Sequence, residues 1–388
     1  MSKLLRQRGI AGVLALFAAV ALTACSSPSE VSSSSGSESS SADDGGSSDE
    51  AQQALEVAYQ GEMGTPPSEP TSPEPGVTVW VVSCGEQIPS CAAPTAAAAE
   101  AAEVAGWTPT VCDGQLNPEG WNNCLRQGIS AGVDVIIPIG LDCPRTEQAY
   151  QEARDAGITV VGGGGVDCDA VGGEKLWASE TLQLEGRTAE ETWNFVGQLA
   201  AEYLIGKTDG QAKALQLIFT DAVWGPWIAE GFDARMADCS ECEVTELEYS
   251  NADVGGGTLP QKFSTALLGD PEVDSVFVPV GGIMAAGLAQ AIQSSGRSDD
   301  LNVITGLGSG ANLDLIRSNG GQDAIVGYPV EWGSWGAVDT AIRVLNGEEP
   351  QYQGNGYQVV DAEHNLPDGP EFSGGVDYKA AYQEAWGV

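Results

Sequence analysis

From residue 77 onward, short apolar runs alternate with segments of helical composition. The run at 77–83, VTVWVVS, is rich in β-branched residues, and an alanine-rich segment comes after it at 92–105. Strands that are apolar on both faces are typical of parallel sheets with helices on both sides. The other predicted strands are 107–111, 133–139, 158–161, 214–219, 243–249, 275–280, 302–305 and 323–327. The other predicted helices are 122–131, 146–156, 190–205, 227–237, 260–268, 285–294 and 312–318.

This alternation predicts an α/β fold. About 310 residues of the pattern exceed what one sheet holds comfortably, so we expect two doubly wound parallel-sheet lobes. In such sheets, ligands bind beyond the carboxyl ends of the strands, where loops lead into helices. The glycine-rich loops at 162–165 and 306–310 lie at such positions, but neither has the spacing of a dinucleotide fingerprint. The sequence also lacks a GxxxxGK[ST] phosphate loop, so we expect no cofactor.

The first 24 residues have the pattern of an export signal. Three basic residues precede an apolar run at 10–22, which is too short to span a membrane as a helix. The tetrapeptide LTAC at 22–25 resembles the lipobox of bacterial lipoproteins. That resemblance implies that residues 1–24 are a lipoprotein signal peptide and that Cys25 is lipidated. The alternative is an ordinary signal peptide with an incidental cysteine after it.

The next segment has the composition of a tether. Residues 26–50 are mostly serine, glycine and acidic residues, which cannot bury a core. Residues 51–59 are compatible with a short helix, and five prolines between 66 and 75 stiffen the approach to the domain. We therefore expect 25–76 to be a lipidated cysteine plus a disordered Ser/Gly/acidic/Pro tether. It would hold the protein at the extracellular face of the cell membrane.

The charge of the chain limits its possible partners. It contains 55 acidic against 16 basic residues, a formal net charge of −39. This balance excludes a nucleic-acid-binding protein, because phosphate binding needs a concentrated basic surface. Ten of the acids lie in residues 26–76, where there is no lysine or arginine. The single histidine, His364, argues against a Ser-His-Asp triad or a histidine-rich metal site, so we expect neither an enzyme nor a metal protein.

Eight cysteines come after Cys25, an even number in a chain with an export signal. This arrangement indicates disulfides, although eight cysteines allow 105 connectivities. Their positions after the predicted strands favour local pairs. The preferred pairs are Cys84–Cys91, Cys112–Cys124, Cys143–Cys168 and Cys239–Cys242. The CSEC motif that contains the last pair could also be a redox pair or half of a zinc site, but no second ligand cluster supports zinc.

Several segments, in their order along the chain, resemble the type I periplasmic binding proteins, particularly the ribose-binding-like branch that serves ABC transporters. The segment ISAGVDVII at 129–137 is similar to the family's AQGVDAIII, and ARDAGITVV at 153–161 is similar to its ANEAGIPVV. AAEYL at 200–204, DSVF at 274–277 and GE at 347–348 also match family motifs. The resemblance covers residues 77 to about 350.

The resemblance implies two lobes that close over a small solute, joined by a three-segment hinge. It places the bilobed solute-binding domain at 77–388. The N-lobe would comprise about 77–178 and 306–328, and the C-lobe about 179–305 and 329–360. The three hinge crossings are expected near 177–180, 328–331 and 357–360.

The family's function implies a monomer that captures a small polar ligand, a sugar or sugar-like compound, and delivers it to the permease of an ABC importer. A sensor built on the same body is a related alternative. A cationic or aromatic metabolite is the alternative ligand. A further alternative is an extracellular hydrolase, for which the carboxylates of Glu86 and Glu331 are the one pair that can be proposed.

The family's sugar-binding residues are poorly retained. Sugar binders of this branch have Asp-Arg after the fourth strand, where this chain has Gly-Gly-Gly-Val at 163–166. Aromatic residues occur where charges are lost, and stacked rings can hold a sugar face or a cation. The predicted ligand-binding residues are Glu86, Gln87, Asp113, Asp221, Trp224, Trp227, Tyr328 and Glu331. For the tryptophans, a place in the hydrophobic core is the alternative.

Overall fold

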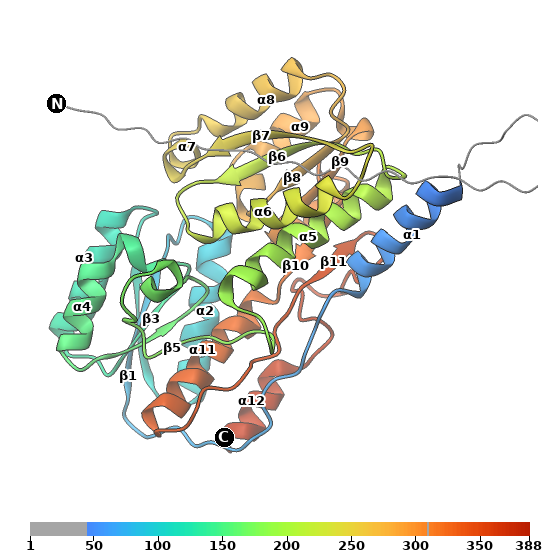
Figure 1. Ribbon diagram of the computed structural model, residues 1–388. Helices are drawn as coiled ribbons and strands as arrows, with labels where there is room; N and C mark the ends of the chain where they lie inside the picture. The colour runs from blue at the N-terminus through green and yellow to red at the C-terminus, as the bar shows by residue number, and fades with distance from the viewer. Residues whose placement is uncertain (1–44, 309) are drawn as a thin grey trace, which may run out of the picture. The chain divides into compact units, whose positions relative to one another are not determined.

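The computed structural model describes residues 45–308 and 310–388, which form two mainly parallel sheets, each flanked by helices (Figure 1). The predicted α/β class with two doubly wound lobes is confirmed. The predicted signal peptide, Cys25 and the start of the tether lie outside the described residues. Within the described part of the chain, no helix combines the length and hydrophobicity needed to cross a membrane.

The first sheet has the strand order β2-β1-β3-β4-β5, and all of its pairs are parallel. Its strands are β1 (Thr78–Ser83), β2 (Thr108–Asp113), β3 (Val135–Pro138), β4 (Thr159–Gly162) and β5 (Ser179–Glu180). The helices between them are α2 (Pro89–Val104), α3 (Pro118–Ala131) and α4 (Glu147–Asp155). The chain moves one way from β1 to β2 and the other way from β2 through β4. Right-handed crossovers therefore place α2 on one face and α3 and α4 on the other.

The second sheet has the order β11-β10-β9-β8-β6-β7, with β11 antiparallel to β10. Its strands are β6 (Lys213–Phe219), β7 (Glu243–Tyr249), β8 (Ser275–Val278), β9 (Asn302–Gly308), β10 (Ala324–Gly327) and β11 (Gln358–Asp361). Its helices are α5 (Ala189–Lys207), α6 (Trp224–Ala237), α7 (Asn251–Gly255), α8 (Leu259–Gly269), α9 (Leu288–Ser294) and α10 (Gly310–Ser318). Helices α5 and α6 pack together, and the opposite direction of the later crossovers places α8, α9 and α10 on the other face.

Two late helices belong to the first lobe. Trp332 and Trp335 of α11 (Val330–Leu345) are fully buried with Trp386 of α12 (Tyr378–Trp386) in the core beneath β1. The predicted lobe boundaries are therefore wrong after residue 305. Residues 306–328 belong to the second lobe, because β9 pairs with β8 and β10 pairs with β9. Short apolar runs fit either sheet equally well, and only this long-range pairing decides between them.

The hinge contains more crossings than the predicted three. The chain passes between the lobes after β5, between β10 and α11, and between α11 and β11, close to the expected positions. It also passes before β1 and again between β11 and α12. Three of these connections lie side by side: Glu62 pairs with Tyr357, and the Gly354 N–H donates to the Gln183 carbonyl at 2.9 Å. A Cβ on Gly354 would lie 2.3 Å from the Thr65 carbonyl oxygen, so this close approach requires glycine.

The N-terminal helix differs from the expected tether. Helix α1 (Gly45–Gln60) packs against α5, and Ala51, Ala54 and Ala58 are buried in the contact. Gly206 of α5 faces this helix, where a Cβ would lie 2.2 Å from a Leu55 carbon. Small side chains on both helices let their backbones approach closely. The short helix expected at 51–59 is present within α1, but the tether prediction is wrong for the described residues from α1 onward, because the alanines of this helix form a helix–helix contact.

Candidate functional site

A cavity of about 210 Å³ lies between the two lobes. It is bordered by the carboxyl ends of strands from both sheets, the position at which α/β sheets bind ligands. Its volume is somewhat below the range of about 300–1,000 Å³ typical of ligand pockets, which indicates a small ligand. The polar and aromatic residues that line it include Asp142, Arg145, Glu180, Gln183, Arg187, Trp193, Phe219, Asp221, Trp224, Tyr249 and Tyr328.

The wall formed by the second lobe is aromatic. Trp193 and Trp224 stack with their ring centroids 5.1 Å apart. Phe219, at the end of β6, lies 5.5 Å from Trp224 and 5.2 Å from Tyr249, at the end of β7. All four rings are buried, with 2–9% of each residue exposed. This continuous aromatic surface can support the apolar face of a sugar, an aromatic ring or a cation.

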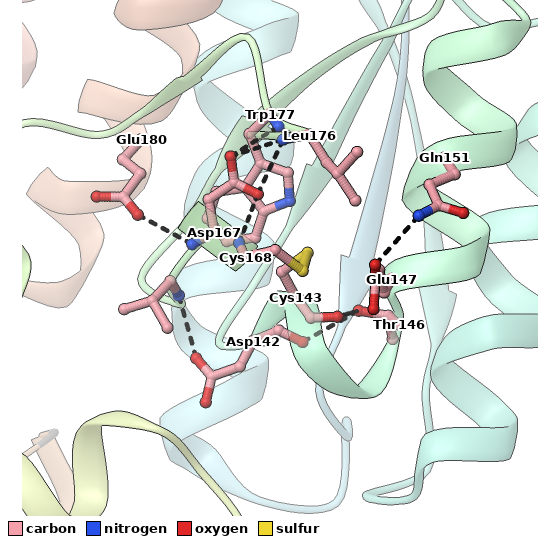
Figure 2. The surroundings of a disulfide bond; sticks show 11 residues. Asp142, Cys143, Thr146, Glu147, Gln151, Asp167, Cys168, Leu176, Trp177 and Glu180 are labelled. Atoms are coloured by element: carbon pink, nitrogen blue, oxygen red, sulfur yellow. Dashed lines mark hydrogen bonds between the residues drawn. A yellow bond between two sulfur atoms is a disulfide. The ribbon is translucent and has the colours of Figure 1, made fainter. Parts of the chain in front are cut away.

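The wall formed by the first lobe carries charges (Figure 2). Asp142 lies after β3, just before the short helical turn Cys143–Arg145 that carries Arg145. Glu180 ends β5, and its carboxylate accepts a hydrogen bond of 2.9 Å from the Asp167 N–H. The Cys143–Cys168 disulfide joins the loop that carries Asp142 and Arg145 to the loop that carries Asp167, the hydrogen-bond partner of Glu180. The covalent link holds the acidic side chains in place relative to each other.

Asp167 organises the loop behind this wall. Its carboxylate accepts backbone N–H hydrogen bonds from Cys168, Leu176 and Trp177 at 2.7, 2.9 and 2.9 Å (Figure 2). The residue is 1% exposed, so these donors replace the water that a carboxylate would otherwise require. Asp167 also lies near the sulfur atoms of Cys143 and Cys168, but both are in the disulfide and cannot act as thiolate ligands for a metal.

Two polar contacts join the lobes across the cavity. The Val223 N–H, before α6, donates a hydrogen bond of 2.6 Å to Asp142 of the first lobe. The Arg145 guanidinium forms a salt bridge of 2.8 Å with Asp221 of the second lobe. The other carboxylate oxygen of Asp221 accepts the Asn251 N–H at 2.7 Å. The described conformation is therefore one in which the lobes are in contact at the edge of the cavity.

Burial changes the protonation equilibria of both first-lobe acids. It raises the pKa of Asp142 to about 6, although the N–H groups of Val223 and Val166 oppose this shift by stabilising the carboxylate. Burial also raises the pKa of Glu180, against the stabilising hydrogen bond from Asp167. The two carboxylates repel each other, which further raises the pKa of Asp142. The first-lobe wall is thus a poorly hydrated, acidic surface.

The hinge supplies the floor of the cavity. Tyr328 comes directly after β10, and its hydroxyl oxygen accepts hydrogen bonds from Gln183 at 3.1 Å and from Asn355 at 2.9 Å. The Tyr357 hydroxyl donates to Gln183 at 3.0 Å, and the two tyrosine rings stack 5.1 Å apart. Burial raises the pKa of Tyr328 to about 12, which keeps its hydroxyl neutral. This network connects three hinge crossings to one surface of the cavity.

The structure brings three of the predicted ligand-binding residues to this cavity: Asp221, Trp224 and Tyr328. The others do not line it. Glu86, Gln87 and Asp113 are exposed, and the Glu86 N–H donates to the Asp113 carboxylate at 3.0 Å. Trp227 packs half-buried against the second-lobe core, and Glu331 lies in the first turn of α11. Asp113 ends strand β2, whereas the other four lie in loops or first helical turns as expected, and the sequence does not give the direction of their side chains.

Sequence reasoning missed several lining residues. Asp142 and Tyr249 stand at carboxyl ends of predicted strands, so the rule that located Trp224 could have found them. The same rule could not find Trp193, which lies inside α5, or Glu180, which ends β5, a strand that the sequence pattern does not predict. The disulfides needed no correction, since the structure contains the four expected pairs.

A family model described as a periplasmic binding protein domain matches residues 81–349. The chain belongs to this family. The match covers both lobes and confirms the predicted type I periplasmic binding protein fold. No curated protein matches this periplasmic binding protein at a significant level.

Solved structures of periplasmic binding proteins share this fold. The arabinose ABC transporter component from Shewanella sp. ANA-3 is 20% identical, with 80% of this chain and 95% of that chain covered and a TM-score of 0.60. An ABC transporter solute-binding protein from Mycobacterium smegmatis with bound glycerol is 20% identical, covering 77% and 99%, with a TM-score of 0.62. One from Burkholderia graminis C4D1M in complex with D-arabinose is 19% identical, covering 76% and 98%, with a TM-score of 0.63. At these identities the similarity establishes the fold alone.

Proposed function

We propose that this protein is the solute-binding component of an ABC importer and encloses a small polar ligand, a sugar or sugar-like compound, between its lobes. One observation carries the proposal: the cavity is lined by both lobes and by the hinge, and cross-lobe contacts close its edge. A ligand in this position touches both lobes, so its binding free energy favours the closed state over an open one. An importer needs such a difference between loaded and empty protein.

The ligand class rests on the cavity and on the solved relatives. Aromatic rings on one wall suit the apolar face of a pyranose or furanose, and carboxylates on the other accept hydroxyl hydrogen bonds. Similar solved structures hold arabinofuranose, D-allose and glycerol as bound molecules. All three are small and polyhydroxylated, which agrees with a small cavity that offers both aromatic and charged surfaces.

The location of the protein is proposed from its N-terminal sequence. We propose that residues 1–24 direct export and that lipid on Cys25 anchors the mature protein to the extracellular face of the membrane. Residues 26–44 then connect this anchor to α1. Cys25→Ser should move the protein from the membrane fraction to the medium. Retention of this variant in the membrane fraction would contradict the anchor.

Binding is tested by calorimetric titration of the full-length chain with pentoses, hexoses and small polyols, in buffer without reductant so that the disulfides persist. The proposal predicts saturable binding of one ligand per chain without chemical turnover. Hydrolysis of glycosides without saturable binding would support an enzyme instead. The hydrolase alternative loses its structural basis, because neither Glu86 nor Glu331 lines the cavity.

A further inference from the structure

The basic groups of the cavity are already paired. Arg145 is held by Asp221 at 2.8 Å. Arg187 is held by Glu62 at 2.6 Å, and its guanidinium lies 4.2 Å from the centre of the Phe195 ring. Among the described residues that line the cavity there is no lysine. Both arginines are therefore engaged in ion pairs, and Arg145 is in addition close enough to Asp142 to stabilise its carboxylate.

Two acids of the first-lobe wall have no such partner. Within the described chain, none of the ion pairs includes Asp142 or Glu180. Asp142 is 6% exposed, and its hydrogen bonds come from backbone N–H groups. Glu180 is held by one backbone N–H. Because Arg145 is already paired with Asp221, Asp142 and Glu180 leave the wall with an excess of negative charge, which is costly to bury and which a ligand cation can neutralise.

The opposite wall offers ring surface. The indole nitrogen of Trp224 and the hydroxyl oxygen of Tyr249 have almost no accessible surface, so a ligand in the cavity meets the rings of this wall and not these two polar atoms. Trp193 stacks on Trp224 and adds an aromatic surface that also attracts cations.

We infer that the ligand is a cationic polyhydroxy compound, an amine-bearing sugar or polyol, whose ammonium group faces Asp142 and Glu180. The apolar face of its carbon frame packs on the aromatic wall that contains Trp193 and Trp224. This inference rests on the proposed function and adds the charge of the solute. One molecule then neutralises the acids of one wall and covers the rings of the other.

Matched pairs of probes test the charge directly. The full-length chain in mild detergent at pH 7 is titrated with D-glucosamine against D-glucose, D-galactosamine against D-galactose, and glucamine against sorbitol. For the matching carbon frame, the amine should bind about tenfold or more tightly, as a charge-assisted contact in a poorly hydrated site allows. Equal or tighter binding of every neutral partner overturns the inference but leaves the proposed function intact. If no probe binds, both the inference and the proposed sugar-like ligand are overturned.

A matched substitution assigns the effect to the acidic wall. Glu180→Gln retains an oxygen for the Asp167 N–H but removes the charge, so the preference for the amine should fall by about fivefold or more. Affinity for the neutral partner should fall by a smaller factor than affinity for the amine, because the glutamine oxygen still accepts a hydroxyl hydrogen bond. Glu174→Gln is the control, because Glu174 is an exposed acid of the same lobe that pairs with Arg154 outside the cavity. An unchanged preference for the amine in folded Glu180→Gln overturns the role of this wall. If the variant does not fold, the comparison of probes on the wild-type protein still tests the charge of the ligand.

Discussion

The two walls of the cavity differ in the kind of interaction that each can offer. The first-lobe wall carries Asp142 and Arg145 on a loop that is fixed by a disulfide, and Glu180 at the end of β5. The second-lobe wall consists of buried rings, including the stacked pair Trp193 and Trp224. Charges give direction and select the ligand, whereas rings give contact area with little loss of conformational entropy. The comparison indicates that the first lobe determines specificity and that the second supplies much of the affinity.

The difference also affects how the lobes meet. The charged wall reaches across to the second lobe through Asp142 and Arg145, whereas the aromatic wall makes its ring contacts within its own lobe. Closure therefore depends on polar groups of the first lobe. The aromatic surface exists whether or not the lobes are closed, because Trp193, Phe219 and Trp224 all belong to the second lobe. We expect variants of the two walls to have different consequences.

The largest effect is expected from the buried acid of the charged wall. Because burial raises the pKa of Asp142 to about 6, the folded state holds its proton more tightly than the unfolded state does. Its contribution to stability is therefore greatest at low pH and is lost as pH rises through about 4 to 6. Asp142→Asn lacks this dependence. Relative to wild type, the variant should gain about 2–3 kcal/mol in unfolding free energy between pH 4 and pH 7.

Urea unfolding of both proteins across this pH range measures the difference. Loss of one cross-lobe hydrogen bond in the variant adds a destabilisation that does not vary with pH, so the two effects separate. A difference that stays constant from pH 4 to pH 7 would show that the charged wall is well hydrated. The contrast between a poorly hydrated acidic wall and an apolar aromatic wall would then be wrong.

The next largest effect is expected from the aromatic wall. Trp224→Ala removes the ring that stacks on Trp193 and should weaken ligand binding by about tenfold or more. Trp227→Ala is the matched control, because Trp227 lies on the same helix but outside the cavity lining. It should change the dissociation constant by less than about threefold. Equal effects of the two substitutions, measured by calorimetry on folded protein, would remove the special role of this wall.

The smallest effect is expected at the edge of the cavity. The salt bridge between Arg145 and Asp221 is partly exposed, with 42% and 23% of the two side chains accessible. Such pairs contribute at most about 1 kcal/mol, so Arg145→Ala should weaken binding by about fivefold or less. The same variant should show a weaker dependence of binding on salt concentration. A loss of a hundredfold would mean that the arginine contacts the ligand itself.

The local sequence pattern is sufficient to predict most helices and strands, but it does not predict how they assemble into the two lobes. The predicted run at 275–280 nearly matches β8, which is buried along its length, and the run at 243–249 matches β7 exactly although most of that strand is exposed. Assigning β9 and β10 to a lobe requires knowledge of their pairing with β8, which is a long-range property. The alanines at 51, 54 and 58 lie in a segment that the sequence predicts as a short helix, but their burial depends on a partner helix more than a hundred residues away.

The candidate site shows the same limit at the level of single residues. Trp224 and Tyr328 are predictable because they come after strands, and both line the cavity. Trp227 stands three residues further along the helix from Trp224, and its ring packs on the core instead. Glu180 was missed because its importance comes from burial and from the absence of an ion-pair partner among the described residues, and neither is visible in the sequence.

A thermal-shift screen of wild type and Trp224→Ala against a library of small metabolites tests the central claim most directly, that one ligand is enclosed between these two walls. A ligand that binds only the folded state raises the melting temperature by mass action. We predict that at least one sugar-like solute raises the melting temperature of wild type and raises that of Trp224→Ala much less. No shift with any solute, or equal shifts in both proteins, would contradict the account.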